Sequence, residues 1–275
     1  MAEARSSVQP RLLPIWLLLE TLGGPARRGA QLILAIAALA LGVLLEGLRP
    51  ATWRRTLRTE LRRSLHQAIA GGFGTAVITA SLVGFGVVYQ AIRWLSFAGQ
   101  QEYTGGLLVI VLVREVTPVL VGLILLGRSG SVTVVECGAA KASGQLDVLE
   151  AQGIDPFALL VLPRVVAMAA AGFTLGVIFL AVSLASGYLT GVFFTLVQAS
   201  PMDQLDNLLG AAAIPEFVLF AVKLVLIGAL VALVSSITGL SSTPAESPSH
   251  LLPRAFVRGL LGILAISAGL SVAVV

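Results

Sequence analysis

Residues 112–121 read LVREVTPVLV and place an arginine and a glutamate side by side inside an apolar run. Soluble domains carry about 25% charged residues, whereas this 275-residue chain carries 12% and is 57% hydrophobic. A helix that spans a lipid bilayer needs roughly 20 mainly apolar residues. Runs of that length without a charge occur at 67–92, 165–202 and 224–245. The composition therefore predicts an all-α integral membrane protein, and the charges at 112–121 need a specific explanation.

Outward from that stretch, the apolar segments predict five transmembrane helices, at 68–93, 105–135, 160–198, 216–240 and 255–275. Segment 30–48 is ambiguous, because only 17 uncharged residues separate Arg28 from Glu46. It could be a sixth span, or a helix that lies in the cytoplasmic interface. We prefer the interfacial helix, because a sixth span would move the four arginines that precede it to the outside.

Glycines in the third segment recur four residues apart, as Gly172 and Gly176 and again as Gly187 and Gly191. This spacing permits two helices to approach closely in lipid. It is equally consistent with the ordinary abundance of glycine in membrane helices.

The basic residues predict the orientation of the chain. Ten of the eighteen lysines and arginines precede Gln67. With that segment inside, the later cytoplasmic loops hold Arg128, Lys141, Arg164, Arg254 and Arg258. The outside loops then keep Arg93 and carry Glu102, Asp203, Asp206 and Glu216. By the positive-inside rule, the N-terminus is cytoplasmic and the C-terminus lies outside.

Arg114 and Glu115 are costly inside a bilayer, since one charge at its centre costs at least about 2.5–3.5 kcal/mol. Adjacent helical residues point about 100° apart, so each charge needs its own partner or a wet cavity. Pro118 cannot donate to the carbonyl of Arg114, which predicts a kink and a free oxygen. Lys223 is the natural candidate to complete a charged cluster. The alternative is that these long side chains reach the headgroups by snorkelling.

Several kinds of chemistry have no motif in this sequence. Lys141 and Lys223 are the only lysines, and neither closes a phosphate-binding GxxxxGK[ST] loop. His66 and His250 lack a second ligand at metal spacing. We therefore expect no catalytic centre and no cofactor in this chain, and we expect no nucleic-acid partner.

The connection between the second and third segments contains a short amphipathic pattern. Ala142, Leu146 and Leu149 recur at helical spacing, and Pro156 biases the preceding residue away from helix. We therefore expect a cytoplasmic helix at 141–151. It either floats at the membrane surface or transmits force from a cytoplasmic partner.

Residues 112–167 resemble the signature of MlaE/YrbE-type permeases, the membrane subunits of MCE-associated ABC lipid transporters. The family pattern runs approximately RE-x-GPV, GR-x-GS, AE-x-G, a TEQ-x-x-A helix, MG-x-DP and PR. The matching residues are Arg114-Glu115, Pro118, Gly127-Arg128, Gly130-Ser131, Glu136, Gly138, Gln145, Gly153, Asp155-Pro156 and Pro163-Arg164. Thr117 and Gly144 depart from the pattern, as does the loop 241–259. Gly144 stands where the family has a glutamate, which puts the usual contact with the ATPase in doubt.

The resemblance implies a cytoplasmic N-terminus at 1–66, with its interfacial helix, and an MlaE-like permease domain at 67–275. It implies a lipid pathway at Arg114, Glu115, Pro118 and Lys223. Coupling to the ATPase falls to Glu136, Lys141, Gln145, Asp147, Glu150, Asp155 and Pro156. Structural roles on the cytoplasmic side fall to Gly127, Arg128, Pro163 and Arg164.

The implied protein is a homodimer in the bacterial inner membrane, with membrane lipids as its substrate. Its implied partners are cytoplasmic ABC ATPase subunits that carry ATP and Mg²⁺, an MCE-domain lipid-binding protein and a STAS-domain protein. Two rival functions remain open. One is a proton-coupled secondary transporter in which Glu115 titrates, and the other is a membrane scaffold that transports nothing.

Overall fold

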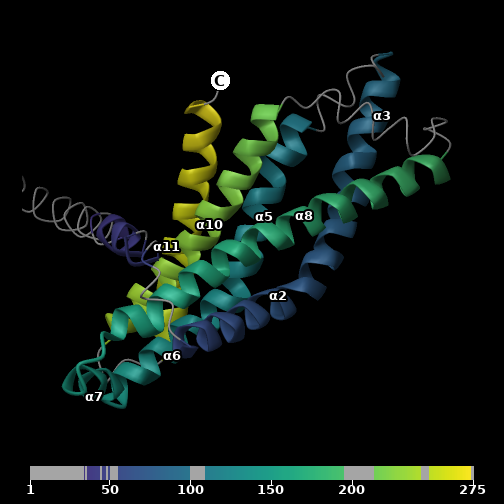
Figure 1. Ribbon diagram of the computed structural model, residues 1–275. Coiled ribbons are helices and arrows are strands. Elements are labelled where there is room, and N and C mark those ends of the chain that lie inside the picture. Colours follow the sequence, from purple (N-terminus) through teal and green to yellow (C-terminus); the bar gives the residue numbers. More distant parts are fainter. Residues whose placement is uncertain are drawn as a thin grey trace, which may run out of the picture. The chain divides into compact units, whose positions relative to one another are not determined.

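A computed structural model describes residues 34, 36–43, 45–47, 49, 55–99, 109–194, 214–242 and 248–273. The chain divides into two units, Met1–Gly42 and Val43–Val275. Almost all described residues belong to the second unit, in which the labelled helices of Figure 1 lie. Throughout those ranges the ordered elements are helices, and no strand occurs.

Five long helices make up the second unit, and three of them contain π-helical segments, labelled η. The first joins α2 (Arg55–Val83), η2 (Gly84–Val88) and α3 (Tyr89–Phe97). The second joins η4 (Val109–Val116), α5 (Thr117–Leu125), η5 (Leu126–Gly130) and α6 (Ser131–Ala142). The third joins η6 (Phe157–Val161) and α8 (Leu162–Phe193). The last two are α10 (Ile214–Leu240) and α11 (Pro248–Ala273).

All five helices are long and apolar enough to cross a membrane, which confirms the predicted fold class. Their ends differ from the prediction. The first helix begins at Arg55, so the arginine-rich run that follows is helical and continuous with the span. The second extends to Ala142, and the fifth begins at Pro248 instead of 255. The prediction ended each segment near a charge, but a helix needs no apolar residues once it leaves the lipid.

The expected interfacial helix at 30–48 lies partly outside the described residues. Its described part forms an apolar helix within Ile36–Gly47, in the length class of 10–17 residues. A helix rises about 1.5 Å per residue, so this part is too short to cross a bilayer by itself. Its placement in the interface stays a prediction.

Close helix contacts centre on α8, which runs beside α2 and also packs against α10 and α5 (Figure 1). A Cβ atom built on Gly172 would lie 2.7 Å from the carbonyl oxygen of Leu224 in α10. One on Gly187 would lie 3.1 Å from the carbonyl oxygen of Gly84 in η2. The glycine spacings therefore serve close helix approach within the chain.

Candidate functional site: a polar network between the spanning helices

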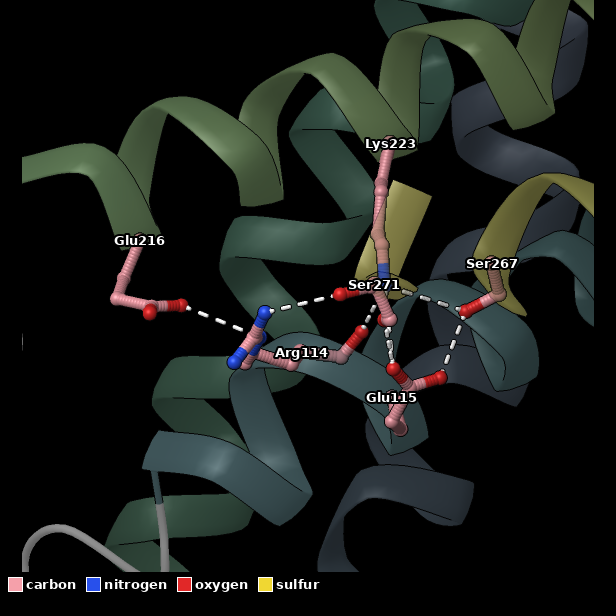
Figure 2. A network of polar contacts seen from close by, with 6 residues as sticks. All are labelled: Arg114, Glu115, Glu216, Lys223, Ser267 and Ser271. Atoms are coloured by element: carbon pink, nitrogen blue, oxygen red, sulfur yellow. Dashed lines mark hydrogen bonds and ion pairs between the residues drawn. The ribbon is translucent and has the colours of Figure 1, made fainter. Parts of the chain in front are cut away.

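A network of polar side chains joins three spanning helices near the C-terminal end of α11 (Figures 1 and 2). η4 contributes two charged residues, α10 another two, and α11 two serines. These residues are Arg114, Glu115, Glu216, Lys223, Ser267 and Ser271.

Lys223 is the centre of the network. Its side chain is fully buried, and its ammonium donates to the backbone oxygen of Arg114 at 2.7 Å and to Ser271 Oγ at 2.5 Å. Glu115 Oε1 lies 3.3 Å away and Ser267 Oγ 3.5 Å away. The ammonium is therefore surrounded by oxygen atoms from η4 and α11, and it turns inward. This geometry is the opposite of snorkelling.

Pro118 accounts for one of these contacts. Because proline has no N–H, it cannot donate to the carbonyl four residues earlier, which belongs to Arg114. Lys223 donates to that same carbonyl. The expected kink takes another form: Val109–Val116 is π-helical, and α5 then begins at Thr117 with proline in its first turn. The chain stays helical through Pro118, and the carbonyl that the proline leaves free becomes a ligand for the lysine.

Glu115 receives the other hydrogen bonds of the inner network. Ser267 Oγ donates to Oε2 at 2.9 Å, and Ser271 Oγ donates to Oε1. The Glu115 side chain is 45% exposed although its Lys223 partner is buried. Neither serine was predicted as a site residue from the sequence. Their spacing of four residues places them on one face of α11, which is the only signal the sequence offers.

Arg114 points away from Glu115, as expected of adjacent helical residues. Its Nη2 donates to the backbone oxygen of Ser271 at 3.3 Å, and its Nε lies 3.5 Å from Glu216 Oε2. From the sequence, Glu216 was counted among the outside charges and was the first residue of the predicted span 216–240, and it lies in the first turn of α10. Its contact with Arg114 was not predicted.

A second group of expected site residues lies at α7 (Gln145–Ala151), in the connection between α6 and η6 (Figure 1). The predicted helix 141–151 is wrong at its start. α6 runs to Ala142, and Gly144 then adopts φ +71° in the turn before α7. Gly153, two residues after the end of α7, has φ +73°. An L-residue rarely adopts this left-handed conformation, so Gly144 serves the turn and lies outside α7.

α7 has part of the amphipathic pattern that the sequence predicted, because Ala142, the first apolar residue of that pattern, lies in α6 and is exposed. Leu146 and Leu149 are half-buried, whereas Gln145, Asp147 and Glu150 are exposed. Lys141, predicted on the same helix, belongs to α6. Its ammonium donates to the backbone oxygen of Leu240 at 2.5 Å, where a cation favourably meets the C-terminal end of α10.

Of the remaining expected residues, Glu136 and Arg164 join α6 to α8, and the others lie in η5 and at the start of the third helix. Glu136 in α6 pairs with Arg164 in α8 at 2.8 Å, and the same guanidinium donates to Cys137 Sγ at 2.9 Å. Asp155 Oδ1 accepts from the backbone N–H of Phe157 at 2.9 Å and so caps the third helix. Pro156 follows Asp155 directly, and Pro163 is buried in the first turn of α8. Gly127 and Arg128 are exposed in η5.

A cleft of about 810 Å³ adjoins the Glu136–Arg164 pair. Its walls come from the N-terminal part of α2, the end of α6, the start of α7 and the start of the third helix. Glu60 and Arg63 line it on the α2 side, and Gln145 lines it on the α7 side.

Residues 61–273, which contain both groups, match the family Permease MlaE. The chain belongs to the MlaE permease family. With its five apolar helices it is a multi-pass membrane protein. The Arg114-Glu115 pair and the Gly127-Arg128 motif, which carried the resemblance, lie in η4 and η5 respectively. π-Helical segments are often found at functional sites.

Three proteins are similar in sequence to this MlaE-family chain over part of their length. Protein TRIGALACTOSYLDIACYLGLYCEROL 1, chloroplastic, from Arabidopsis thaliana is 28% identical over 77% of this chain and 59% of its own length. A probable ABC transporter permease protein from Synechocystis sp. is 30% identical over 68% of this chain and 71% of its own length. The intermembrane phospholipid transport system permease protein MlaE from Haemophilus influenzae is 36% identical over 32% of this chain and 34% of its own length.

Proposed function

We propose that this MlaE-family chain is the permease subunit of an ABC-type transporter that moves phospholipid, or a related lipid, between the inner membrane and an MCE-domain partner. The polar network in the spanning helices carries this proposal. Charged groups inside a membrane protein commonly mark the path of a polar substrate. The Haemophilus relative, whose name includes phospholipid transport, supports the same class of substrate.

A phospholipid needs a polar contact beside an apolar chamber, because it has a charged head and two apolar tails. Arg114 supplies a forked donor that suits phosphate, and its side chain is 16% exposed. Lys223 is fully buried and surrounded by oxygens, so in our proposal it holds η4 against α11 and does not bind the head directly. Glu115 balances the lysine.

We assign the coupling to ATP hydrolysis to α7, because its polar residues are exposed at the end of α6. Two cytoplasmic ABC ATPase subunits would dock there and would carry ATP and Mg²⁺. The permease would work as a homodimer, with an MCE-domain protein on the far side of the membrane and a STAS-domain protein as a further partner. This arrangement follows the family resemblance and the positive-inside rule.

The test is to purify the permease with its copurifying partners and to measure three quantities: retained lipid by mass spectrometry, ATPase activity, and lipid transfer in proteoliposomes. We expect phospholipid to be retained and its transfer to require ATP. Replacing Arg114 by alanine should reduce retention while the complex still assembles. Transfer driven by a proton gradient without ATP would instead support the secondary transporter. Full transfer by the Arg114→Ala variant would refute the role of the network.

A further inference from the structure

The polar network has two halves that differ in how well their charges are paired. In the inner half, both oxygens of Glu115 and the ammonium of Lys223 are hydrogen-bonded. In the outer half, Arg114 Nε and Glu216 Oε2 lie 3.5 Å apart. Both atoms are buried, and neither has a hydrogen-bond partner. Figure 2 shows the outer pair at the edge of the network, with Glu216 reaching Arg114 from α10.

This outer contact is a weak way to hold an arginine. A buried charged atom without a hydrogen bond is unfavourable, and an N–O distance of 3.5 Å is longer than that of a charge-assisted hydrogen bond. An anion that offers two oxygens in the plane of the guanidinium would satisfy Arg114 better than Glu216 does. Phosphate has that geometry.

Glu216 also has a second favourable place for its charge. It lies in the first turn of α10, where the partial positive charge of the helix N-terminus stabilises a carboxylate. Releasing Arg114 would therefore not leave Glu216 without electrostatic support. The pair is built so that the carboxylate can be exchanged for another anion.

We infer that Glu216 occupies the phosphate position on Arg114 in the resting state and competes with the phosphate of a lipid headgroup. The inference rests on the proposed function, because it takes Arg114 as the phosphate contact. Glu216 then lowers the affinity for phospholipid and promotes its release. A lipid without phosphate does not engage this exchange.

The test measures equilibrium binding of fluorescent phosphatidylglycerol to the purified full-length permease, beside fluorescent diacylglycerol, which has the same tails and no phosphate. Glu216→Gln should bind phosphatidylglycerol about two- to fivefold more tightly, the upper part of the range that one partly exposed ion pair supports. Its diacylglycerol binding should stay unchanged. Glu216→Asp keeps the charge and should stay near the parent. Glu46→Gln is the matched control, because it removes the same charge from an exposed pair with Arg49.

Adding Arg114→Ala to Glu216→Gln should abolish the gain. Unchanged affinity in Glu216→Gln, with weaker binding in Arg114→Ala alone, would overturn the competition and leave the proposed lipid contact standing. An equal gain for diacylglycerol would overturn it too.

If Arg114→Ala alone binds phosphatidylglycerol like the parent, the lipid contact itself fails. Direct binding of inorganic phosphate to Glu216→Gln would support the exchange and show that the site also takes the free anion. No binding of inorganic phosphate, with the lipid gain intact, would assign the site to the headgroup.

Discussion

At the scale of single residues, Lys223 links segments that are more than a hundred positions apart in the sequence. Its ammonium meets the Arg114 carbonyl, the Glu115 carboxylate and the hydroxyl of Ser271. The link works because Pro118 leaves that carbonyl without its helical donor. Removing the lysine therefore affects a carbonyl and a carboxylate together.

Lys223→Met keeps a long side chain and removes the charge. Breaking a buried ion pair by removing one partner costs about 3–5 kcal/mol. We expect the free energy of unfolding of Lys223→Met to decrease by an amount near the lower end of that range, because Glu115 stays partly exposed. Thermal unfolding of the purified chain in detergent measures the loss. Arg93→Met, at an exposed position of α3, is the control. Adding Glu115→Gln to Lys223→Met should recover part of the stability. If the double variant instead loses as much free energy of unfolding as the two single variants together, the two residues are not coupled.

At the scale of elements, the turn between α6 and α7 and the contact between α8 and α10 both depend on glycine, for different reasons. Gly144 has φ +71° and open space around its Cβ position, so only backbone conformation constrains it. Gly172 lies in regular helix, but a Cβ atom there would meet the Leu224 carbonyl. One position needs a left-handed backbone, and the other needs a missing side chain.

Gly144→Glu tests the turn. The family resemblance alone suggests that a glutamate here would strengthen contact with the ATPase, but the left-handed backbone costs a side-chain-bearing residue about 1–2 kcal/mol. We expect Gly144→Glu to tilt α7 and weaken copurification of the ATPase. Gly144→Asn should be tolerated, because asparagine adopts this conformation more readily. Stronger association of the glutamate variant would show that the turn can unwind.

Gly172→Ala tests the helix contact. We expect it to lower the melting temperature, because the new methyl group would press on the backbone of α10. Gly74→Ala is matched to it, since Gly74 lies in α2 with nothing within 4 Å of its Cβ position. Alanine there should be neutral, or stabilise by about 0.5–1 kcal/mol through helix propensity. Equal effects of the two substitutions would contradict close packing at Gly172.

Much of this architecture was predictable from sequence. The spans follow from charge-free runs, and the separate partners of Arg114 and Glu115 follow from helical geometry. Ser267 and Ser271 were not predictable, because a serine in a membrane helix more often bonds to its own backbone. The turn at Gly144 was missed because the apolar spacing of Ala142, Leu146 and Leu149 continues across it as in one cytoplasmic helix. The π-helical segments leave no signal in apolar periodicity.

At the scale of the whole molecule, the residues assigned to lipid and those assigned to the ATPase lie at opposite ends of the spanning helices (Figure 1). The second helix bears Arg114 near one end and leads into α7 at the other. A change in the position of α7 can therefore reach the polar network through one continuous helix. This separation supports a transporter whose energy source and substrate lie on different sides of the membrane.

The orientation of these ends is testable with tags. We expect a tag at the C-terminus to be accessible from outside the inner membrane and a tag at the N-terminus only from the cytoplasm, because the positive-inside rule places the arginine-rich segment inside. Protease protection in intact spheroplasts measures this. Both tags on one side would mean that segment 30–48 crosses the bilayer, or that one of the five helices does not.

Charge reversal on α7 tests the other end. Asp147→Lys with Glu150→Lys should abolish stimulation of the partner ATPase while the permease still inserts, because both side chains are exposed and none of α7 is buried. ATP hydrolysis by the copurified complex is the measurement, and Glu46→Lys, in the exposed ion pair with Arg49, is the control for charge reversal away from α7. Normal stimulation in the double variant would place the docking surface elsewhere.

The π-helical segment η5 separates α6 from the part of the second helix that bears Arg114. A π-turn holds one residue more than an α-turn, and each residue advances a helix by about 100°. η5 therefore fixes the angular phase between the two ends of this helix. If its extra residue migrated along the axis, the segment it crossed would rotate against the rest without the helix coming apart. The two ends of the second helix could thus rotate relative to each other while the helix stays continuous.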